Sequence, residues 1–256
     1  MSSHPLISCL MITANRKKLA NRSIKCFLRQ SYKNKELIII DDGRDDYSNL
    51  LSTIPVNRIN YVRIKNKEKL NLGELRNISL DIAKGDYIAQ WDDDDWYHAD
   101  RLTVQANVIN KGFEACCLES SLTHINSPEF KNLPFIGTLN GGIPGSIMHV
   151  NSKSIRYPDA QKGEDTVYLN NWKKKKYTSI NKAFGYLFIR CYHGNNTWDL
   201  NHFKRRIHNS PTLTIQYIWY NYFKRDMSEH PIFKLEKKFK NAFYQYKEDS
   251  IKLDLF

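Results

Sequence analysis

Four consecutive aspartates, Asp92, Asp93, Asp94 and Asp95, directly follow an apolar segment, residues 86–91. Four carboxylates in one short loop repel one another unless a cation neutralises them. Carboxylate oxygens suit hard ions such as Mn²⁺ or Mg²⁺, and a metal held by few carboxylates completes its coordination with phosphate oxygens and water. The run therefore predicts a divalent metal site for a phosphorylated ligand. The other interpretation is a solvated acidic turn that caps the following helix.

A second acidic group, Asp41 and Asp42, is followed by Gly43 and also comes directly after an apolar segment, residues 36–40. The carboxyl ends of the strands are where open α/β sheets bind their ligands. Both acidic groups are therefore candidates for one binding site, provided that the preceding segments are neighbouring parallel strands.

The elements that must position these residues follow an α/β pattern. Short apolar runs alternate with amphipathic stretches, which is typical of strand–helix–strand units around a mostly parallel central sheet flanked by helices. The predicted strands are residues 6–12, 36–40, 59–64, 86–91 and 114–118, the predicted helices are 19–30, 72–83 and 101–110, and the Gly-rich stretch 137–145 is predicted to be a loop around a binding cleft.

The last part of the chain is predicted to be helical, basic and aromatic. Its apolar residues recur at three- and four-residue spacing from about residue 212, at Ile215, Ile218, Trp219, Tyr222 and Phe223. We expect this tail to pack on the main domain. We therefore divide the chain into one elaborated domain, residues 1–210, and a helical C-terminal extension, residues 211–256.

Composition narrows the class of protein. Hydrophobic residues are 41%, which is near the globular average, and 39 Lys and Arg against 27 Asp and Glu give a net charge of +12. Polyanions, phosphorylated ligands or an anionic membrane surface suit that charge. No run approaches the roughly 18 to 20 apolar residues of a membrane span, and the start lacks signal-peptide features, so we expect a cytoplasmic protein, at most peripheral at the inner face of the membrane. Five cysteines without Cys-x-x-Cys spacing argue against a zinc site or a disulfide framework.

Several segments occur together in a fixed order. They are ISCLMITANR at 7–16, SIKCFLRQSY at 23–32, ELIIIDDG at 36–43, LGELRN at 72–77, AKGDYI at 83–88 and the Asp-x-Asp within the four aspartates. With a later match at 163–165 and 190–198, this order resembles the family-2 glycosyltransferases, nucleotide-sugar transferases of the GT-A (Rossmann-like) fold. The resemblance spans residues 6–105 and implies a nucleotide-sugar half at 1–105 and an acceptor half, with the catalytic base, at 106–210.

The resemblance also assigns residues to the site. Its donor-binding residues are Thr13, Asn15, Arg16, Asp42, Arg76 and Asp92. Asp94 is the main metal ligand, with Asp92 helping and His193 completing the coordination or contacting a phosphate; a hydrogen-bonded loop histidine is the alternative. Trp91, beside the aspartates, is a candidate for stacking on the base or sugar, with packing in the core as the alternative.

Transfer from a nucleoside diphosphate needs a base that deprotonates the acceptor hydroxyl, and inversion places that base opposite the diphosphate. Glu164 and Asp165 lie where the family has its base, and we choose Asp165. The alternative is an ordinary acid at a helix start.

We therefore expect a metal-dependent, inverting glycosyltransferase that uses Mn²⁺ or Mg²⁺ and a nucleotide-sugar donor, most simply a UDP-sugar. The expected acceptor is a bacterial surface glycan or its lipid-linked precursor. The alternatives are transfer to hydroxylated bases in DNA by a viral enzyme, a nucleotidyltransferase, and a non-catalytic nucleotide-sugar or polyanion binder. The basic tail could contact an anionic membrane, DNA or the acceptor.

Overall fold

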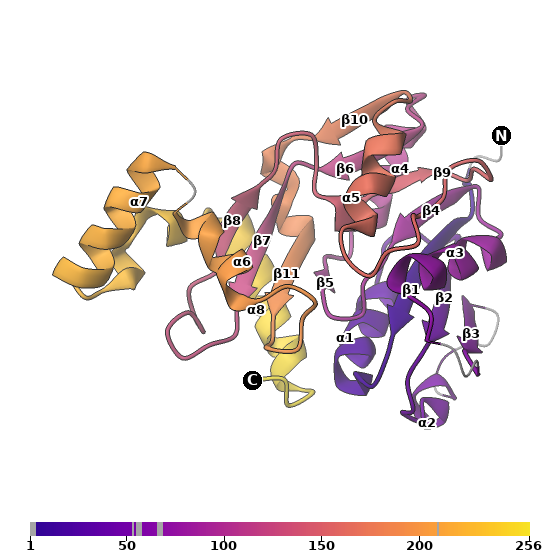
Figure 1. Cartoon of the computed structure of the whole chain (residues 1–256), viewed down its shortest axis with the longest axis horizontal. Helices are drawn as coiled ribbons and strands as arrows, with labels where there is room; N and C mark the ends of the chain where they lie inside the picture. Colours follow the sequence, from indigo (N-terminus) through magenta and orange to yellow (C-terminus); the bar gives the residue numbers. More distant parts are fainter. Residues whose placement is uncertain (1–3, 53, 55–57, 66–68, 209) are drawn as a thin grey trace.

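The structure, a computed structural model, describes residues 1–256 except 1–3, 53, 55–57, 66–68 and 209. Its centre is a seven-stranded sheet in the order β10, β6, β9, β4, β1, β2, β3 (Figure 1). These strands are β1 (Ile7–Thr13), β2 (Lys35–Asp41), β3 (Ile59–Arg63), β4 (Tyr87–Gln90), β6 (Ala115–Leu118), β9 (Met148–Val150) and β10 (Tyr177–Ile180). Only β9 runs antiparallel to its neighbours among these described strands, so the predicted mostly parallel sheet is confirmed.

A smaller sheet continues from the first in the order β5, β11, β7, β8. Its strands are β5 (Trp96–Tyr97), β7 (Ser120–Ile125), β8 (Phe135–Thr138) and β11 (Phe188–Tyr192). The α-helices are α1 (Lys17–Leu28), α2 (Ser48–Leu51), α3 (Leu72–Ile82), α4 (Arg101–Ile109), α5 (Glu164–Trp172), α6 (Leu200–Lys204), α7 (Pro211–Ile218) and α8 (Lys237–Ile251). In the described chain, none of these helices is long and apolar enough to cross a bilayer.

Strand alternation divides the core between the two faces of the main sheet. In β1, Ile7, Cys9 and Met11 pack on one face, and Leu10 and Ile12 pack on the other. Successive side chains of a strand point to opposite faces, so a strand that is covered by helices on both sides must be apolar throughout. Helices α1, α4 and α8 contribute to the first face, and α3 and α5 contribute to the second.

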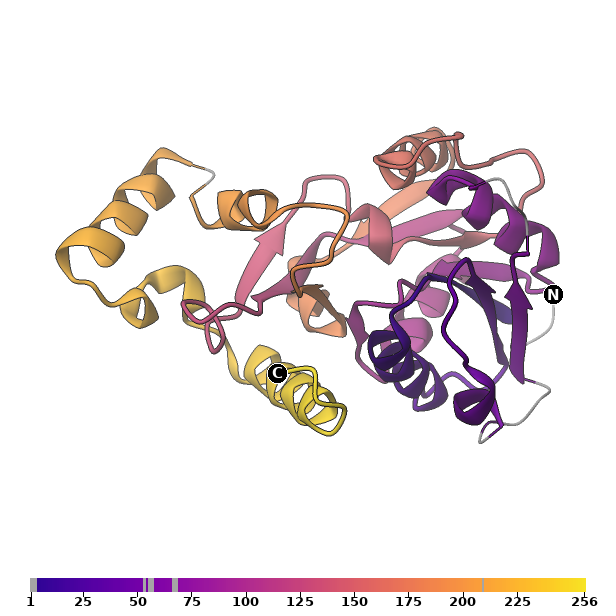
Figure 2. The same ribbon diagram turned by 60° about the horizontal axis from the view of Figure 1, so that its bottom comes forward.

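The C-terminal extension behaves differently in its two halves. Helix α8 packs into the same core as α1 through buried residues that include Phe239, Phe243 and Tyr246. Helix α7 stands away from the rest of the chain in both views (Figures 1 and 2), and Ile215 and Phe223 are 69% and 70% exposed. The expectation that the whole tail packs on the main domain is therefore wrong for α7 and its following turn, because only Tyr217 and Tyr220 in this segment reach an apolar cluster.

Candidate active site

A pocket of about 660 Å³ lies at the carboxyl ends of β1, β2 and β4, and its volume is in the range typical of small-molecule sites. The Gly-rich segment reaches it through Leu139, Pro144 and Gly145. The sequence-predicted residues that line the pocket are Thr13, Arg16, Asp42, Arg76, Asp92, Asp94 and Asp165. Both acidic groups therefore meet in one place, because β4, β1 and β2 are adjacent parallel strands.

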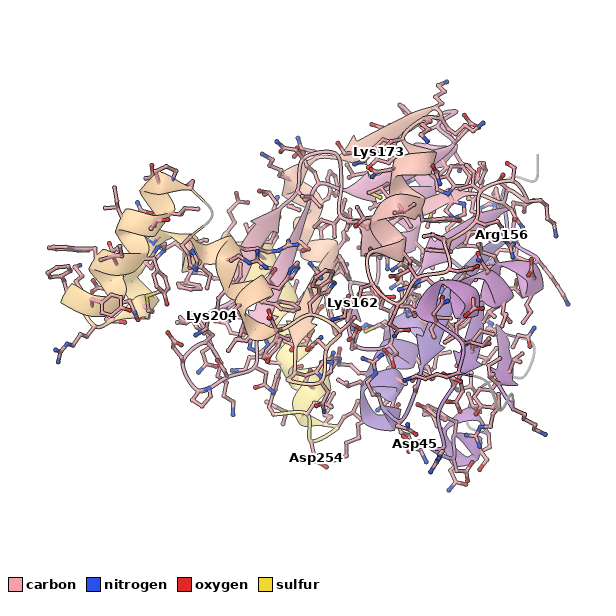
Figure 3. All side chains as sticks on the ribbon, viewed as in Figure 1. Asp45, Arg156, Lys162, Lys173, Lys204 and Asp254 are labelled. Atoms are coloured by element: carbon pink, nitrogen blue, oxygen red, sulfur yellow. The ribbon has the colours of Figure 1, made fainter. Side chains whose placement is uncertain are left out.

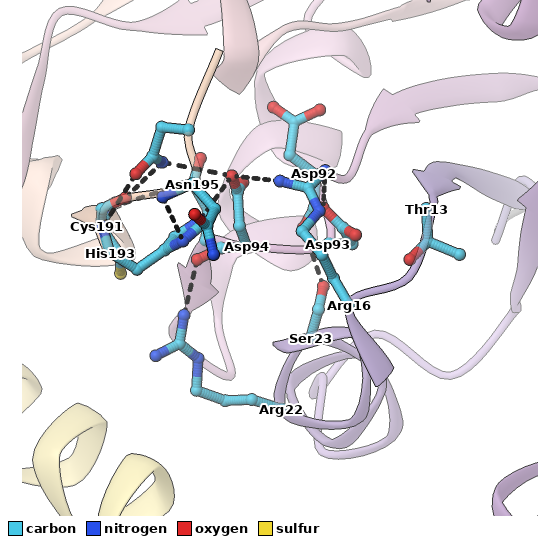
Figure 4. A network of polar contacts seen from close by, with 12 residues as sticks. Thr13, Arg16, Arg22, Ser23, Asp92, Asp93, Asp94, Cys191, His193 and Asn195 are labelled. Carbon is cyan, nitrogen blue, oxygen red and sulfur yellow. Dashed lines mark hydrogen bonds and ion pairs between the residues drawn. The ribbon is translucent and has the colours of Figure 1, made fainter. Parts of the chain in front are cut away.

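Helix α1 holds the backbone of the aspartate loop (Figure 4). Ser23 Oγ donates to the carbonyl oxygen of Asp92 at 2.9 Å, and the buried Arg22 donates through Nη2 to the carbonyl oxygen of Asp94 at 2.6 Å. These bonds use main-chain oxygens of the loop. The carboxylates of Asp92 and Asp94 therefore stay available to side chains and ligands on the pocket side.

Asp94 is the carboxylate with the most cationic surroundings. Its Oδ2 accepts hydrogen bonds from Arg16 Nη1 at 3.1 Å, His193 Nε2 at 3.3 Å and Asn196 Nδ2 at 3.3 Å. Burial alone would raise the pKa of Asp94, but the bond from His193 and the charge of Arg16 outweigh it and lower the pKa to about 2. Asp94 is thus an anion at any physiological pH, as a metal ligand must be.

Asp93 and Asp95 differ from Asp94 because their side chains are buried. Asp93 and Asp95 are buried, and burial raises the pKa of each carboxyl, to about 7 for Asp93 despite its ion pair with Arg16 at 2.8 Å. Asp95 accepts a hydrogen bond from the backbone N–H of Cys191. All four aspartates reach the lining of the pocket, but Asp92 and Asp94 are half-buried whereas Asp93 and Asp95 are buried.

Arg76 connects the aspartate loop to the start of α5. Its Nη2 donates to Asp92 Oδ1 at 2.9 Å, and its Nε donates to Glu164 Oε1 at 3.1 Å. A capping box between Asn71 and Glu74 fixes the first turn of α3, which carries Arg76. The sequence predicts contact between Arg76 and the donor, and the structure gives the guanidinium two carboxylate partners at the edge of the pocket.

Asp165 lies next to Glu164, yet its surroundings differ. Glu164 is buried, and burial raises its pKa while the ion pair with Arg76 opposes that rise. Asp165 lines the pocket, and within the described part of the chain its Oδ1 accepts hydrogen bonds from the N–H and hydroxyl of Thr166 alone. Among the described residues it forms no ion pair, so its carboxylate remains free to accept a proton.

Three expected donor residues need further comment. Asp42 lines the pocket, whereas Asp41 is buried and accepts from Tyr61 and Arg63. Asn15 is exposed with φ 54°, and its Oδ1 accepts from the N–H of Arg44 at 2.7 Å, so it joins the loops after β1 and β2 from outside the pocket lining. The proposed stacking of Trp91 on the donor is wrong, because Trp91 is fully buried and packs 4.0 Å from the ring of Tyr97.

The residues present fit a metal ion that shares its coordination with the donor. Among the described residues, no three His, Cys, Asp or Glu side chains are grouped to hold a metal. Asp94 and His193 nevertheless offer a carboxylate and an imidazole 3.3 Å apart. Asp92 is held instead by Arg76 and Gln90. Two protein ligands leave positions for phosphate oxygens, which is the common arrangement for ions that bind nucleoside diphosphates.

Comparison with known proteins gives the family. The model of glycosyl transferase family 2 matches residues 8–194. The chain belongs to glycosyltransferase family 2. Among curated relatives, an uncharacterized glycosyltransferase of Haemophilus influenzae is 32% identical over 79% of this chain and 85% of its own. The putative colanic acid biosynthesis glycosyl transferase WcaA of Escherichia coli K12 is 39% identical over 41% of this chain, and the match spans only 38% of the relative.

A further relative and two solved structures complete the comparison. The UDP-Glc:α-D-GlcNAc-diphosphoundecaprenol β-1,3-glucosyltransferase WfaP of E. coli is 36% identical to this glycosyltransferase over 41% of each chain. S. aureus TarS (1–349) with UDP-GlcNAc superposes with a TM-score of 0.54, at 14% identity, over 95% of this chain and 81% of that one. The mannosyltransferase PcManGT of Pyrobaculum calidifontis, with GDP-Man and Mn²⁺, gives 0.56 at 12% identity, over 98% and 72%. These structures confirm the GT-A fold of this glycosyltransferase.

The sequence did not assign two arginines of the pocket to the site, Arg190 in β11 and Arg206 after α6. Arg190 begins the matched segment 190–198, and Arg206 belongs to the basic run 204–206, which from the sequence is either a solvated face or a contact with an anionic acceptor or membrane. The signal that could have separated it is helical geometry, because successive residues of a 3₁₀ helix point about 120° apart, so Arg206 faces away from the exposed Arg205. The structure turns Arg206 inward to the pocket.

Proposed function

We propose that this glycosyltransferase transfers a sugar, with inversion, from a nucleotide-sugar donor to a hydroxyl of a lipid-linked glycan during bacterial surface-glycan synthesis. A UDP-sugar is the simplest donor. The name of WfaP, a partial relative, states a UDP-Glc donor and a diphosphoundecaprenol-linked acceptor. TarS with UDP-GlcNAc shares the fold. The pocket lies where nucleotide ligands bind in open α/β sheets.

The donor side of the pocket is formed by Thr13, Asp42 and the aspartate loop. We assign Asp94 and His193 as the residues that hold Mn²⁺ or Mg²⁺, with Asp92 oriented by Arg76 beside them. When bound, the ion supplies charge neutralisation to the departing diphosphate. Arg16 contacts both Asp93 and Asp94, so its guanidinium is already within reach of a phosphate bound at Asp94.

The observation that carries the proposal is the difference in contacts between Glu164 and Asp165. Glu164 forms an ion pair with Arg76, whereas Asp165 faces the same pocket as Asp94 and forms no ion pair among the described residues. A carboxylate in that position can accept the proton of an acceptor hydroxyl as the hydroxyl attacks the anomeric carbon. Attack from the side of Asp165 displaces the diphosphate on the opposite face of the sugar, which inverts the anomeric configuration.

The proposal is tested by transfer itself. The protein is incubated with UDP-Glc, UDP-Gal, UDP-GlcNAc or GDP-Man, with Mn²⁺, and with a synthetic lipid-diphosphate-linked GlcNAc acceptor. Mass spectrometry should detect one added hexose or N-acetylhexosamine for one donor, and NMR should show the anomeric configuration opposite to that of the donor. Transfer with retained configuration would contradict the assigned mechanism. Donor hydrolysis by water without any transfer would contradict the acceptor class.

We further propose that α7 and its following turn rest on an anionic membrane surface. Five side chains in this segment are exposed and apolar or aromatic: Ile215, Ile218, Trp219, Tyr222 and Phe223. Residues 200–225 contain five Lys or Arg and no Asp or Glu. Aliphatic and aromatic side chains beside basic ones suit the boundary between lipid headgroups and acyl chains, and the two isoleucines gain nothing from stacking on nucleic-acid bases. This contact would bring the pocket to a lipid-linked acceptor.

A further inference from the structure

We propose that Arg190 and Arg206 form a phosphate-binding site on the acceptor side of the pocket, and that its ligand is the phosphate group attached to the acceptor sugar. This inference rests on the proposed function, because it takes the acceptor to be a sugar linked to lipid through phosphate. The two arginines are not among the assigned donor residues. The site explains two half-buried positive charges to which the donor chemistry gives no role.

The two arginines reach the pocket from a different part of the fold than the donor residues. Arg190 is in β11 of the smaller sheet, and Arg206 is in the short 3₁₀ helix Arg205–Ile207 that follows α6. Thr13 and Asp42, by contrast, are at the ends of strands of the main sheet. Figure 1 shows β11 and α6 on the side of the molecule that leads to α7. Figure 3 labels Lys204, the last residue of α6 and the first of the basic run 204–206.

Neither guanidinium is neutralised by a carboxylate. In the part of the chain that the structure describes, no ion pair involves Arg190 or Arg206, although the other pocket arginines, Arg16 and Arg76, each bind two carboxylates. Arg190 instead lies 5.4 Å from the ring centroid of Phe203. An arginine held by an aromatic ring keeps its N–H groups free for a ligand.

Arg206 is the stronger indication. Its Nη1 is buried and lacks a hydrogen-bond partner among the described residues. Gly137 leaves the space for this atom, because a Cβ there would lie 3.2 Å from Nη1. A buried donor without a partner is costly and rare, so its persistence points to a ligand that completes the site.

The charges around this site also favour an anion. Burial and the repulsion by Arg190 lower the pKa of Arg206 to about 10, so Arg206 remains charged at neutral pH although the neighbouring guanidinium opposes that charge. His202, which lines the same pocket, has its pKa lowered by burial and by both arginines, and it is therefore mostly neutral at pH 7. Asp95 is an acid whose charge acts on Arg190, but its Oδ1 accepts a hydrogen bond from the N–H of Cys191 and it forms no ion pair with Arg190 among the described residues. An anionic phosphate would relieve the repulsion and satisfy the free donors.

The position of the pair selects the acceptor phosphate over the donor diphosphate. Asp94 and Arg16, which we assign to the donor diphosphate, line the pocket and are bonded to each other, and His193 contacts Asp94 from outside the pocket lining. Arg206 is five residues before α7, the segment that we place on the membrane. A phosphate between a sugar near Asp165 and a lipid near α7 would pass the two arginines.

The test measures phosphate binding directly, without sugar transfer. Phenyl phosphate, a soluble phosphate monoester, is titrated into the full-length protein with UDP and Mg²⁺ held at saturation, and ³¹P NMR line broadening reports binding. Arg206→Gln and Arg190→Gln should each weaken binding of phenyl phosphate at least tenfold and leave the dissociation constant of UDP within twofold. Arg205→Gln is the matched control, because Arg205 is the exposed neighbour, and it should bind phenyl phosphate as the unaltered protein does.

Three results would overturn the inference. They are unchanged phenyl phosphate binding by Arg206→Gln, displacement of phenyl phosphate by UDP, and an equal loss of UDP affinity in the two variants; the last two would assign the pair to the donor. Misfolding is monitored by the melting temperature, which Arg206→Gln should not lower because it removes a half-buried charge that forms no ion pair among the described residues. Arg206→Lys keeps the positive charge and should retain part of the binding. If phenyl phosphate binds as expected but no lipid-diphosphate acceptor receives a sugar, the site stands and the proposed function is wrong.

Discussion

Arg76 on α3 and Glu164 at the start of α5 form a buried ion pair, with 3.1 Å between Arg76 Nε and Glu164 Oε1. The pair joins two elements 88 residues apart in the sequence. Close contact between the start of α3 and the segment before α5 supports it, because a Cβ on Gly73 would lie 1.9 Å from the carbonyl oxygen of Pro158. The ion pair therefore fixes where α5 begins, and with it the position of Asp165.

The first prediction concerns Asp165. Asp165→Asn keeps the shape of the side chain and removes the proton acceptor, so kcat for sugar transfer should fall roughly 10²- to 10⁴-fold, the usual contribution of a positioned base. The dissociation constant of the donor, measured by calorimetry, should change less than threefold. Asp159→Asn is the control, because Asp159 is exposed and outside the pocket. A near-normal rate for Asp165→Asn would place the base elsewhere.

The second prediction concerns metal dependence. Asp94→Ala removes the carboxylate that accepts from Arg16, His193 and Asn196, and UDP should then bind at least tenfold more weakly in Mn²⁺. Calorimetric titration with and without Mn²⁺ should show that the ion no longer improves affinity. Asp100→Ala is a matched control, since Asp100 lies at the start of α4 and its side chain makes no capping bond. Undiminished stimulation by Mn²⁺ in Asp94→Ala would exclude Asp94 as a ligand.

The third prediction concerns pH and the buried His149. Burial lowers the pKa of His149 to about 4, while its ring nitrogens contact the carbonyl of Val150 and the hydroxyl of Tyr168. In the unfolded chain the histidine has an ordinary pKa of about 6.5 and binds the proton more tightly. The contribution of neutral His149 to stability is therefore fully present above pH 6.5 and is lost as the pH falls toward 4. From pH 8 to pH 5 this residue should reduce the free energy of unfolding by about 1 to 2 kcal/mol.

Urea unfolding at pH 8 and pH 5 measures that change. His149→Gln lacks the titrating group, so its free energy of unfolding should fall less across this range than that of the unaltered protein, whatever its stability at pH 8. An identical fall in both proteins would show that His149 is not responsible.

The fourth prediction concerns the exposed segment after residue 210. Trp219→Ser combined with Phe223→Ser should reduce binding to vesicles of phosphatidylglycerol and phosphatidylcholine about tenfold or more, because each aromatic side chain loses favourable burial of roughly 1.5 to 3 kcal/mol. Vesicle sedimentation measures the binding, and 0.5 M NaCl should weaken it. Tyr244→Ser provides the control, since Tyr244 is an exposed aromatic residue on α8. Equal loss in the control, or no loss in the double variant, would contradict the membrane contact.

Strand ends and helix positions were largely predictable, because they depend on local patterns. The nearly continuous apolar runs of β1 and β2 required strands covered on both faces, and the adjacency of β4, β1 and β2 brought the acids after β2 and β4 to one edge of the sheet. The ordered motifs then indicated the family, which the family model confirmed. The division of the chain at residue 210 and the roles of the site residues stay predictions.

The sequence by itself determined which strands carry acids at their carboxyl ends, because periodicity of two and of 3.6 residues is written in neighbouring positions. Only the tertiary structure decided which member of each acidic pair is free: Asp41 is buried while Asp42 faces the pocket, and Glu164 is engaged by Arg76 while Asp165 is not. It also buried Trp91 and brought Arg190 and Arg206 together. Adjacent residues of the same type have the same local pattern, and their burial and charge partners come from elements distant in the sequence.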